Sequence, residues 1–251
     1  MTQENLNPES TSFGTKTVTA DQKTDKVLGV FDSVATKYDI MNDVMSGGIH
    51  RIWKDKFINQ VNPQSGHDIL DMAGGTGDIA FRHHKKTNGT ANITVSDINQ
   101  SMLDVGQDRA IDRGITDMQW VATDAATLPF DDNSFDIYTI AFGLRNVTKI
   151  DDALAEAARV LRPGGKFYCL EFSHVDNPII KKIYDVYSDK LIPKFGEIVA
   201  KDKDSYEYLV ESIRKFPRRE ALKARLLQAG FSKARFTTMT FGVVAIHEAH
   251  V

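Results

Sequence analysis

Three features of the chain predict a Rossmann-like α/β fold, in which a doubly wound sheet is mostly parallel and ends in an antiparallel C-terminal hairpin strand. An apolar stretch runs into three glycines at 69–78, as a buried parallel strand does before a tight turn at a helix N-terminus. Strand-like runs then alternate with helical patterns as far as residue 172. Two β-rich runs at 234–247 are close enough in sequence to form a hairpin.

Composition narrows the functional classes. The 251 residues are 41% hydrophobic and 26% charged, which is typical of a globular protein in water. A net charge of −3 and the lack of a basic stripe argue against a nucleic-acid partner. The single cysteine, Cys169, excludes an internal disulfide and indicates a reducing compartment, so we expect a cytoplasmic protein. No apolar run reaches the roughly 20 residues of a transmembrane helix, and no signal-peptide core is visible.

The part before the glycine loop predicts a tail and a helical cover. Residues 1–25 are rich in Thr, Gln, Asn, Ser and Asp, which predicts a disordered polar tail before a single domain over 26–251. Over 26–66, apolar residues recur at steps of three and four, interrupted at 41–49 by a turn or a mobile cover. This periodicity predicts N-terminal helices that cover the domain.

The remaining elements follow in chain order. Predicted strands occupy 69–73, 93–97, 119–123, 135–142 and 166–172. Predicted helices occupy the stretch from Asp78, residues 101–113, and residues 151–161, where Pro163 and two glycines follow. Amphipathic stripes without a strand pattern predict a helical insertion over 178–215, after the fifth strand. A helix at 218–229 and strands at 234–239 and 241–247 complete the domain.

Taken alone, the glycine loop predicts an adenosine-bearing cofactor without identifying it. Gly75, Thr76 and Gly77 begin a literal dinucleotide-binding pattern. Asp97 lies 20 residues after Gly77, where a carboxylate would bind a ribose. NAD satisfies this pattern as well as other adenosine cofactors do. An ordinary tight turn, with Asp97 as a capping carboxylate, is the structural alternative.

Three further features favour S-adenosylmethionine over NAD. Asp71 lies just before the glycines, where enzymes that use S-adenosylmethionine have an acidic residue facing the methionine end of the cofactor. Asp124 and Ala125 end the third strand, where a carboxylate and the adjacent N–H group can bind an adenine ring. Residues 159–166 form the helix end and turn before the fifth strand. Together these features resemble the class I S-adenosylmethionine-dependent methyltransferases.

Three signatures narrow the resemblance to one family. Residues 31–43 read FDSVATKYDIMND, residues 142–147 read FGLRNV, and residues 212–217 contain SIR and FP. They are similar to the N-terminal, middle and late signatures of the ubiquinone/menaquinone biosynthesis C-methyltransferases. The resemblance extends from about Val27 to His247.

The resemblance implies a reaction and a cofactor site. The implied reaction is the methylation of a ring carbon of a polyprenylated benzoquinol or a demethylmenaquinol, with S-adenosylmethionine as methyl donor, S-adenosylhomocysteine as product and no metal. The cofactor-binding positions are Gly75, Thr76, Gly77, Asp97, Asp124 and Ala125. Ala141 stands where many relatives have a serine, and an alanine side chain forms no hydrogen bond to the cofactor.

Three residues are candidates for the chemistry on the acceptor. Arg145 and Asn146 follow the fourth strand at its carboxyl end, where ligands bind in open α/β sheets. We expect Arg145 to stabilise a phenolate and Asn146 to orient a quinol oxygen or a water, with pairing of Arg145 to a carboxylate as the alternative. We expect Tyr38 to cover the ring or to relay a proton, with packing in the core as the alternative.

The histidines carry less information. The adjacent His83 and His84 lack the i, i+4 spacing of a metal pair, so surface positions are expected for both. His50 and His174 are further candidates for a base, with a plain polar role as the alternative.

The apolar prenyl tail implies that the enzyme works at the inner face of a membrane or receives its substrate from a partner. The insertion at 178–215 is the candidate contact, although an amphipathic stripe also suits core packing. A quinone-biosynthesis complex and a homodimer both remain open. So do three rival functions: another small-molecule or RNA methyltransferase, a nicotinamide dehydrogenase, and a non-catalytic scaffold.

Overall fold

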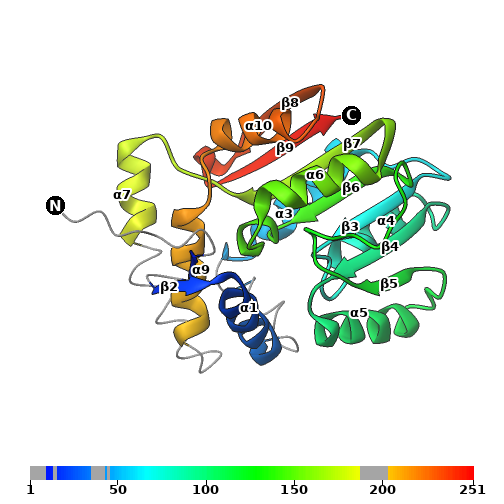
Figure 1. Ribbon diagram of the computed structural model, residues 1–251, viewed down its shortest axis with the longest axis horizontal. Coiled ribbons are helices and arrows are strands. Elements are labelled where there is room, and N and C mark those ends of the chain that lie inside the picture. Colours follow the sequence, from blue (N-terminus) through cyan, green and yellow to red (C-terminus); the bar gives the residue numbers. More distant parts are fainter. Residues whose placement is uncertain (1–9, 14–15, 35–42, 44–45, 187–202) are drawn as a thin grey trace.

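A seven-stranded sheet is the centre of the computed structural model, which describes residues 10–13, 16–34, 43, 46–186 and 203–251. In spatial order its strands are β5 (Gln119–Ala122), β4 (Asn92–Asp97), β3 (Asp68–Met72), β6 (Phe135–Ala141), β7 (Leu161–Phe172), β9 (Val244–His250) and β8 (Lys233–Met239). The pairs from β5 to β7 are parallel, and β9 runs antiparallel to both of its neighbours (Figure 1). The predicted fold class is therefore confirmed.

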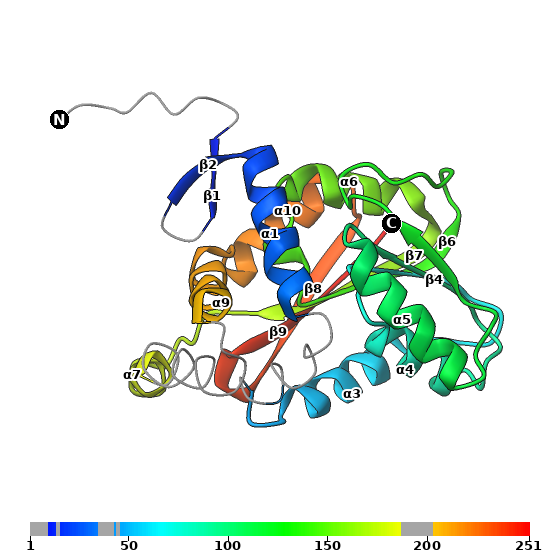
Figure 2. The same ribbon diagram turned by 90° about the horizontal axis from the view of Figure 1, so that it is seen from below.

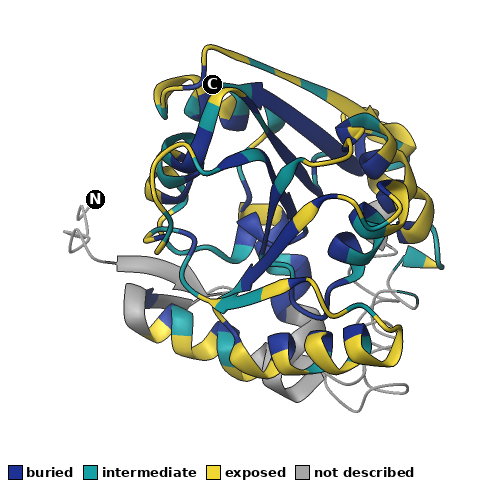
Figure 3. Ribbon diagram, turned by 90° about the vertical axis from the view of Figure 1, so that its right-hand side faces the viewer, coloured by how far each residue is buried: buried dark blue, intermediate teal, exposed yellow. Residues whose placement is uncertain are grey.

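Helices cover both faces of the sheet because successive side chains of a strand point to opposite faces. One face packs α3 (His50–Val61), α4 (Asp78–Lys86) and α5 (Gln100–Asp112) in a cluster with Ile69 of β3. The other face packs α6 (Ile150–Val160) and α10 (Arg219–Gln228) in a cluster with the next residue, Leu70. Figure 3 shows buried strands inside and helices with exposed outer surfaces.

Two strand boundaries differ from the prediction. β7 begins at Leu161, directly after α6, so Pro163 lies inside the strand at a register shift in its pairing with β6. An irregular ladder of this kind tolerates proline and glycine. The turn between β8 and β9 comprises residues 240–243, so β9 starts at Val244. Phe241, which we placed in the last strand, lies in this turn and is 75% exposed.

The N-terminal segment also differs from the prediction. β1 (Ser10–Phe13) and β2 (Lys16–Thr19) form an antiparallel pair, and α1 (Ala20–Val34) begins within the predicted tail. The Gln22 N–H group donates to Oγ1 of Thr19 at 3.3 Å, and the Thr19 N–H group donates to Oε1 of Gln22 at 3.1 Å. This reciprocal capping box is a sequence signal for a helix start. The expectation of disorder is thus wrong for the described residues of 1–25.

The predicted insertion contains two described helices, α7 (Pro178–Val186) and α9 (Lys203–Lys215). Leu209, Val210 and Ile213 of α9 are buried, as core packing of an amphipathic helix requires. On α7, by contrast, Ile179 is exposed. Figures 1 and 2 place both helices beside the carboxyl end of β7, on the same side of the sheet as α1. Within the described ranges, no helix has both the length and the apolar character needed to cross a membrane.

Candidate cofactor pocket and acceptor site

The main pocket lies at the carboxyl ends of β3, β4 and β6, where the strand order reverses direction. α1, α3 and the loops that follow these strands contribute its walls. The predicted site residues in its lining are Gly75, Thr76, Asp97, Asp124, Ala125 and Asn146. Gly77 and Arg145 lie outside this lining, and Tyr38 lies outside the described residues.

The glycine loop is too closely packed for side chains. Gly77 has a φ of 85°, and a Cβ atom there would lie 2.9 Å from the rings of Phe81 and Trp120. At Gly74, a Cβ atom would lie 2.6 Å from Cγ1 of Val95. Gly77 therefore shapes the start of α4, where a left-handed backbone is required. Gly75 is the glycine of the predicted pair that faces the pocket.

Asp97 ends β4 and holds the glycine loop in place. Its Oδ2 accepts a hydrogen bond from the Gly75 N–H group at 3.0 Å, and its Oδ1 accepts one from the Asn99 N–H group at 2.9 Å. Burial raises the pKa of Asp97 to about 6, although these backbone donors oppose the shift. Each carboxylate oxygen retains a further lone pair. The side chain can therefore hold the loop and accept a ribose hydroxyl at the same time.

Asp124 and Ala125 follow β5 at the neighbouring edge of the pocket. Oδ1 of Asp124 accepts a hydrogen bond from the Ala126 N–H group at 2.9 Å, an arrangement that fixes the carboxylate in its turn. Ala125 is buried and lines the pocket together with Asp124. A fixed carboxylate beside a small buried residue suits the edge of an adenine ring. Ala141, at the end of β6, also lines the pocket.

Asp71 supplies a buried carboxylate to the same pocket. The side chain belongs to a residue only 1% exposed, and its Oδ1 accepts a hydrogen bond from the Thr139 hydroxyl at 2.8 Å. Its Oδ2 has no hydrogen-bond partner in the described part of the chain. Burial raises the pKa of Asp71 to about 7 against the hydrogen bonds from the Thr139 hydroxyl and the Ala80 N–H group, which lower it, and the charges of Asp78 and Asp97 add to the rise. A buried carboxylate oxygen of this kind is costly unless a cation binds it.

The turn after β6 separates two of the predicted acceptor-side residues. The short helix η2 (Leu144–Asn146) places Asn146 in the lining of the main pocket, whereas Arg145 lines a second pocket. Arg145 is buried, and its Nη1 donates to Oε1 and Oε2 of Glu171 at 3.0 and 3.3 Å. Arg145 is thus engaged in the carboxylate pair that was the structural alternative for it.

Tyr208 of α9 is a site residue that the sequence reasoning missed. Its hydroxyl donates to Oδ1 of Asn146 at 3.1 Å, and burial raises the pKa of Tyr208 to about 12. Tyr208 therefore remains protonated near neutral pH and connects the insertion to the turn after β6. The amphipathic stripe of α9 does not mark Tyr208, because hydrophobic periodicity identifies buried positions and not their hydrogen bonds.

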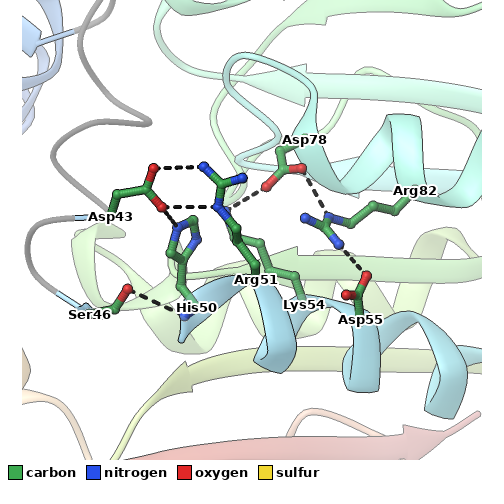
Figure 4. A network of polar contacts seen from close by, with 8 residues as sticks. All are labelled: Asp43, Ser46, His50, Arg51, Lys54, Asp55, Asp78 and Arg82. Carbon is green, nitrogen blue, oxygen red and sulfur yellow. Dashed lines mark hydrogen bonds and ion pairs between the residues drawn. The ribbon is translucent and has the colours of Figure 1, made fainter. Parts of the chain in front are cut away.

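Charged side chains join α3 to α4 beside the glycine loop (Figure 4). Lys54 donates to Oδ2 of Asp78 at 2.7 Å, and Oδ1 of Asp78 accepts from Nε of Arg82 at 3.0 Å. Arg82 in turn pairs with Asp55 on α3. Because Lys54 and Asp78 also line the pocket, this network fastens the covering helix to the cofactor loop.

The histidines fall into two groups. His50 is buried, and its Nε2 lies 2.8 Å from Oδ1 of Asp43. His50 and His174 lie outside the lining of the main pocket. The surface position expected for His83 is wrong, because His83 is fully buried. It follows Ile79 by four residues and therefore lies on the buried face of α4.

These residues fit the predicted cofactor. The unpartnered Oδ2 of Asp71 suits the ammonium group of S-adenosylmethionine, and Asp97 suits its ribose. Asp124 and Ala125 suit the adenine at the other end of the lining. NAD offers a ribose and an adenine but no primary ammonium group for Asp71. Asp71 thus favours S-adenosylmethionine where the glycine pattern alone does not.

Comparison with known proteins identifies a family model that the sequence matches. The model of the ubiE/COQ5 methyltransferase family matches residues 17–250. The ubiquinone/menaquinone biosynthesis C-methyltransferase UbiE of Dinoroseobacter shibae is 52% identical over 240 residues, which cover 95% of this chain and 96% of that protein. The human mitochondrial 2-methoxy-6-polyprenyl-1,4-benzoquinol methylase is 49% identical over 271 residues, which cover 94% of this chain and 83% of that protein.

Solved structures share the fold at low sequence identity. A methyltransferase from Thermotoga maritima, described as S-adenosylmethionine-dependent, matches with a TM-score of 0.60 at 16% identity, covering 88% of this chain and 98% of that one. Phosphoethanolamine N-methyltransferase 2 of Haemonchus contortus, in complex with S-adenosyl-L-methionine, matches with a TM-score of 0.56 at 19% identity. That match covers 75% of this chain and 38% of the other.

Proposed function

This chain belongs to the ubiE/COQ5 methyltransferase family, and we propose that it methylates a ring carbon of a polyprenylated benzoquinol or a demethylmenaquinol. It is an S-adenosylmethionine-dependent methyltransferase of quinone biosynthesis. S-adenosylmethionine carries its methyl group on a positively charged sulfur, which makes that group electrophilic without a metal. Metal independence is therefore part of the proposal, and treatment with a chelator should leave turnover unchanged.

The arrangement of three carboxylates around one pocket carries the proposal. Asp71, Asp97 and Asp124 come from the carboxyl ends of three neighbouring strands, β3, β4 and β5. Asp71 is suited to bind an ammonium group, Asp97 a ribose and Asp124 an adenine. Together they fix one orientation of the cofactor, with its methionine end towards β3 and β6. The quinol would then approach from the side of the turn after β6.

Asn146 is the described acceptor-side candidate in that position. Tyr208 occupies Oδ1 of its amide, which leaves the Nδ2 donors for other partners. A donor beside a quinol oxygen favours the ionised oxygen, and ionisation makes the ortho carbon more nucleophilic. Holding that carbon in line for attack can lower a barrier by about 7–11 kcal/mol in favourable cases.

Arg145 and Tyr38 complete the proposed acceptor site. Arg145 would stabilise the phenolate through its positive charge, since its Nε has no hydrogen-bond partner in the described part of the chain. The carboxylate of Glu171 offsets part of that charge at the site. The assignment of Tyr38 to covering the ring or relaying a proton rests on the family signature alone.

The prenyl tail needs an apolar route of its own. We assign this contact to the insertion at 178–215, where the side chain of Ile179 is exposed. Binding at the inner face of a membrane, or delivery by a quinone-biosynthesis complex, would bring the tail to this insertion. A homodimer is compatible with either arrangement.

Two measurements test the proposal. Deletion of the gene should cause a demethylated quinone precursor to accumulate, as judged by mass spectrometry, and the intact gene should restore the methylated quinone. Isothermal titration of the purified protein should show binding of S-adenosylhomocysteine and none of NAD. A normal quinone profile after deletion would refute the proposed substrate, whereas binding of NAD alone would refute the cofactor.

A non-catalytic scaffold is the rival function that the sequence alone leaves open, and membership of a family of methyltransferases argues against it. A variant with Asp71→Asn distinguishes the two functions. Because the chain is a methyltransferase, this variant should fail to restore the methylated quinone while the protein accumulates normally. A scaffold with the same substitution should restore it.

A further inference from the structure

His83 is a buried histidine that the site described so far does not use. It lies on α4, is fully buried, and its Nε2 lies 3.3 Å from the Thr139 hydroxyl oxygen on β6. The Thr139 hydroxyl lies 2.8 Å from Oδ1 of Asp71 on β3. The three side chains thus form a continuous buried chain that ends at the pocket.

A proton count fixes the direction of this chain. When Asp71 is ionised its oxygens only accept hydrogen bonds, so the single Thr139 proton goes to Oδ1 of Asp71. The Leu70 carbonyl, at 3.5 Å from the Thr139 oxygen, is the more distant acceptor. Thr139 can then only accept from His83, which must carry its proton on Nε2. The His83 Nδ1 atom, which has no partner in the described part of the chain, becomes the bare nitrogen.

The electrostatics agree with a neutral ring. Burial lowers the pKa of His83 to about 3, so the side chain is uncharged at neutral pH. A neutral imidazole with its hydrogen on Nε2 is the tautomer that the chain requires. His83 therefore orients the Thr139 hydroxyl without placing a positive charge near Asp71. A charge there would compete with an ammonium group for the carboxylate.

We propose that His83 and Thr139 are positioning residues for Asp71, which they hold so that its Oδ2 remains available to the ammonium group of the cofactor. The inference rests on the proposed function only in requiring an S-adenosylmethionine-type ligand. His83 donates to Thr139, Thr139 donates to Oδ1 of Asp71, and Oδ2 stays unpaired until the ligand binds. The chain crosses from α4 through β6 to β3, so it also fixes the glycine loop between β3 and α4.

The first test reads the tautomer directly. Nitrogen-15 NMR of the purified protein at pH 7.5 should show the two ring nitrogens of His83 as a neutral Nε2–H tautomer. Thr139→Val removes the acceptor and should shift the tautomer equilibrium. Thr139→Ser keeps the hydroxyl and should preserve the original spectrum. An Nδ1–H tautomer or a charged ring in the unmodified protein would overturn the proposal.

The second test compares two ligands by isothermal titration. S-adenosylhomocysteine carries the ammonium group, and 5′-methylthioadenosine lacks it but keeps the ribose and adenine. His83→Met and Thr139→Val should each weaken S-adenosylhomocysteine binding about tenfold, the effect of losing one hydrogen bond. Both variants should leave 5′-methylthioadenosine binding unchanged, because the affected end of the pocket is not used.

Matched variants separate this role from general damage to the fold. His83→Gln retains a donor near the position of Nε2 and should restore most of the S-adenosylhomocysteine affinity. His84→Gln alters the adjacent, half-buried histidine and should have no effect on either ligand. An equal loss for both ligands, or no loss in His83→Met, would refute the positioning role. If the unmodified protein bound 5′-methylthioadenosine but not S-adenosylhomocysteine, the proposed function itself would fail.

Discussion

Asp71 combines two opposing requirements in one residue. Its burial favours the neutral acid and raises the pKa to about 7, but an ammonium ligand requires the ionised form. Below pH 7 the carboxyl group is mostly protonated, so we expect S-adenosylhomocysteine affinity to fall about tenfold per pH unit from pH 7 towards pH 5.5. At higher pH the α-amino group of the ligand itself loses its proton, so affinity should pass through a maximum above pH 7. Isothermal titration across this range measures the profile.

The control for that profile is again 5′-methylthioadenosine. Asp97, whose pKa burial raises to about 6, lines the pocket where the ribose would bind and should affect both ligands. The difference between the two profiles therefore isolates Asp71. The sign for stability is opposite: an acid whose pKa is higher in the folded state destabilises the fold progressively as pH rises from about 4 to 7. Asp71→Asn should accordingly raise the melting temperature of the ligand-free protein at pH 8 while abolishing ligand binding. Identical pH profiles for both ligands would contradict this account.

Arg145 requires a paired substitution because its partner is buried. Arg145→Ala should abolish turnover and leave cofactor affinity nearly unchanged, but it also leaves Glu171 as a buried unpaired charge, which costs about 3–5 kcal/mol of stability. Combining Arg145→Gln with Glu171→Gln neutralises both partners and keeps the fold. If the charge of Arg145 serves the acceptor, the double variant should bind S-adenosylhomocysteine normally and lose at least 100-fold in turnover, an effect of about 2.7 kcal/mol. Recovery of turnover in the double variant would show that the pair has a structural role only.

The residues that line the pocket could be predicted from the sequence where strand position alone brings a side chain to it. Asp97 ends β4 and Asp124 follows β5, so strand position brings both to the pocket. Arg145 and Asn146 are adjacent in sequence, but the 3₁₀ turn η2 directs them to different pockets. His83 was misplaced because the neighbouring pair His83 and His84 looked polar, although the spacing from Ile79 indicated the buried face. The direction of side chains in a turn, and the buried face of a short helix, were thus the features that we could not predict from the sequence.

At the scale of elements, α3 carries one buried and one exposed ion-pair partner, and their contributions to stability can be compared. Lys54 has a side chain only 7% exposed, whereas that of Arg51 is 62% exposed, and both pair with aspartates. Lys54→Met should therefore lower the free energy of unfolding by about 1–3 kcal/mol, because Asp78 loses a buried partner. Arg51→Met should cost less than about 1 kcal/mol, as exposed ion pairs usually do. Urea denaturation followed by circular dichroism compares them, and equal losses would refute the assigned roles.

The insertion allows a second contrast between matched isoleucines. Ile179 on α7 is 71% exposed and Ile111 on α5 is 60% exposed, so replacing either should change stability little. If α7 contacts the substrate tail or a membrane, Ile179→Ser should reduce co-sedimentation with anionic phospholipid vesicles at least threefold. Ile111→Ser should not reduce it. Equal sedimentation of both variants would remove α7 from the proposed contact.

Element boundaries were predictable where the signals are local. The capping box of Thr19 and Gln22 marks the start of α1 in the sequence itself. The start of β7 was not predictable, because Pro163 and the two glycines after it look like the end of an element. They fit within the strand because the pairing of β7 with β6 shifts register there. The length of the β8–β9 turn depends on left-handed conformations at Thr240 and Phe241, which neither residue type favours.

At the scale of the whole molecule, the order of strands places the main pocket between the sheet and the N-terminal helix. Alternation of strands and helices predicts a doubly wound sheet and a site at its carboxyl edge. The sequence could not show that α1 closes that edge, because packing between distant segments has no local pattern. Thr24, Val27 and Leu28 of α1 line the same pocket as the glycine loop and Asp97. The cofactor would therefore contact a segment that lies far in sequence from the strands of the sheet.

The contact between α1 and the pocket predicts which segments become protected from hydrogen exchange when a ligand binds. Among the described residues, α1 packs mainly against β1, β2 and α5 and little against the seven-stranded sheet, so its amides should exchange with solvent faster than those of the central strands in the ligand-free protein. With saturating S-adenosylhomocysteine, hydrogen–deuterium exchange read by mass spectrometry should slow at least tenfold over the part of α1 around residues 24–28 and in the loops at 73–78 and 97–99. α10 lies on the other face of the sheet and serves as the internal control, where exchange should not change. Slower exchange in the glycine loop with none in α1 would mean that α1 does not close the pocket, and a uniform slowing that included α10 would indicate global stabilisation instead.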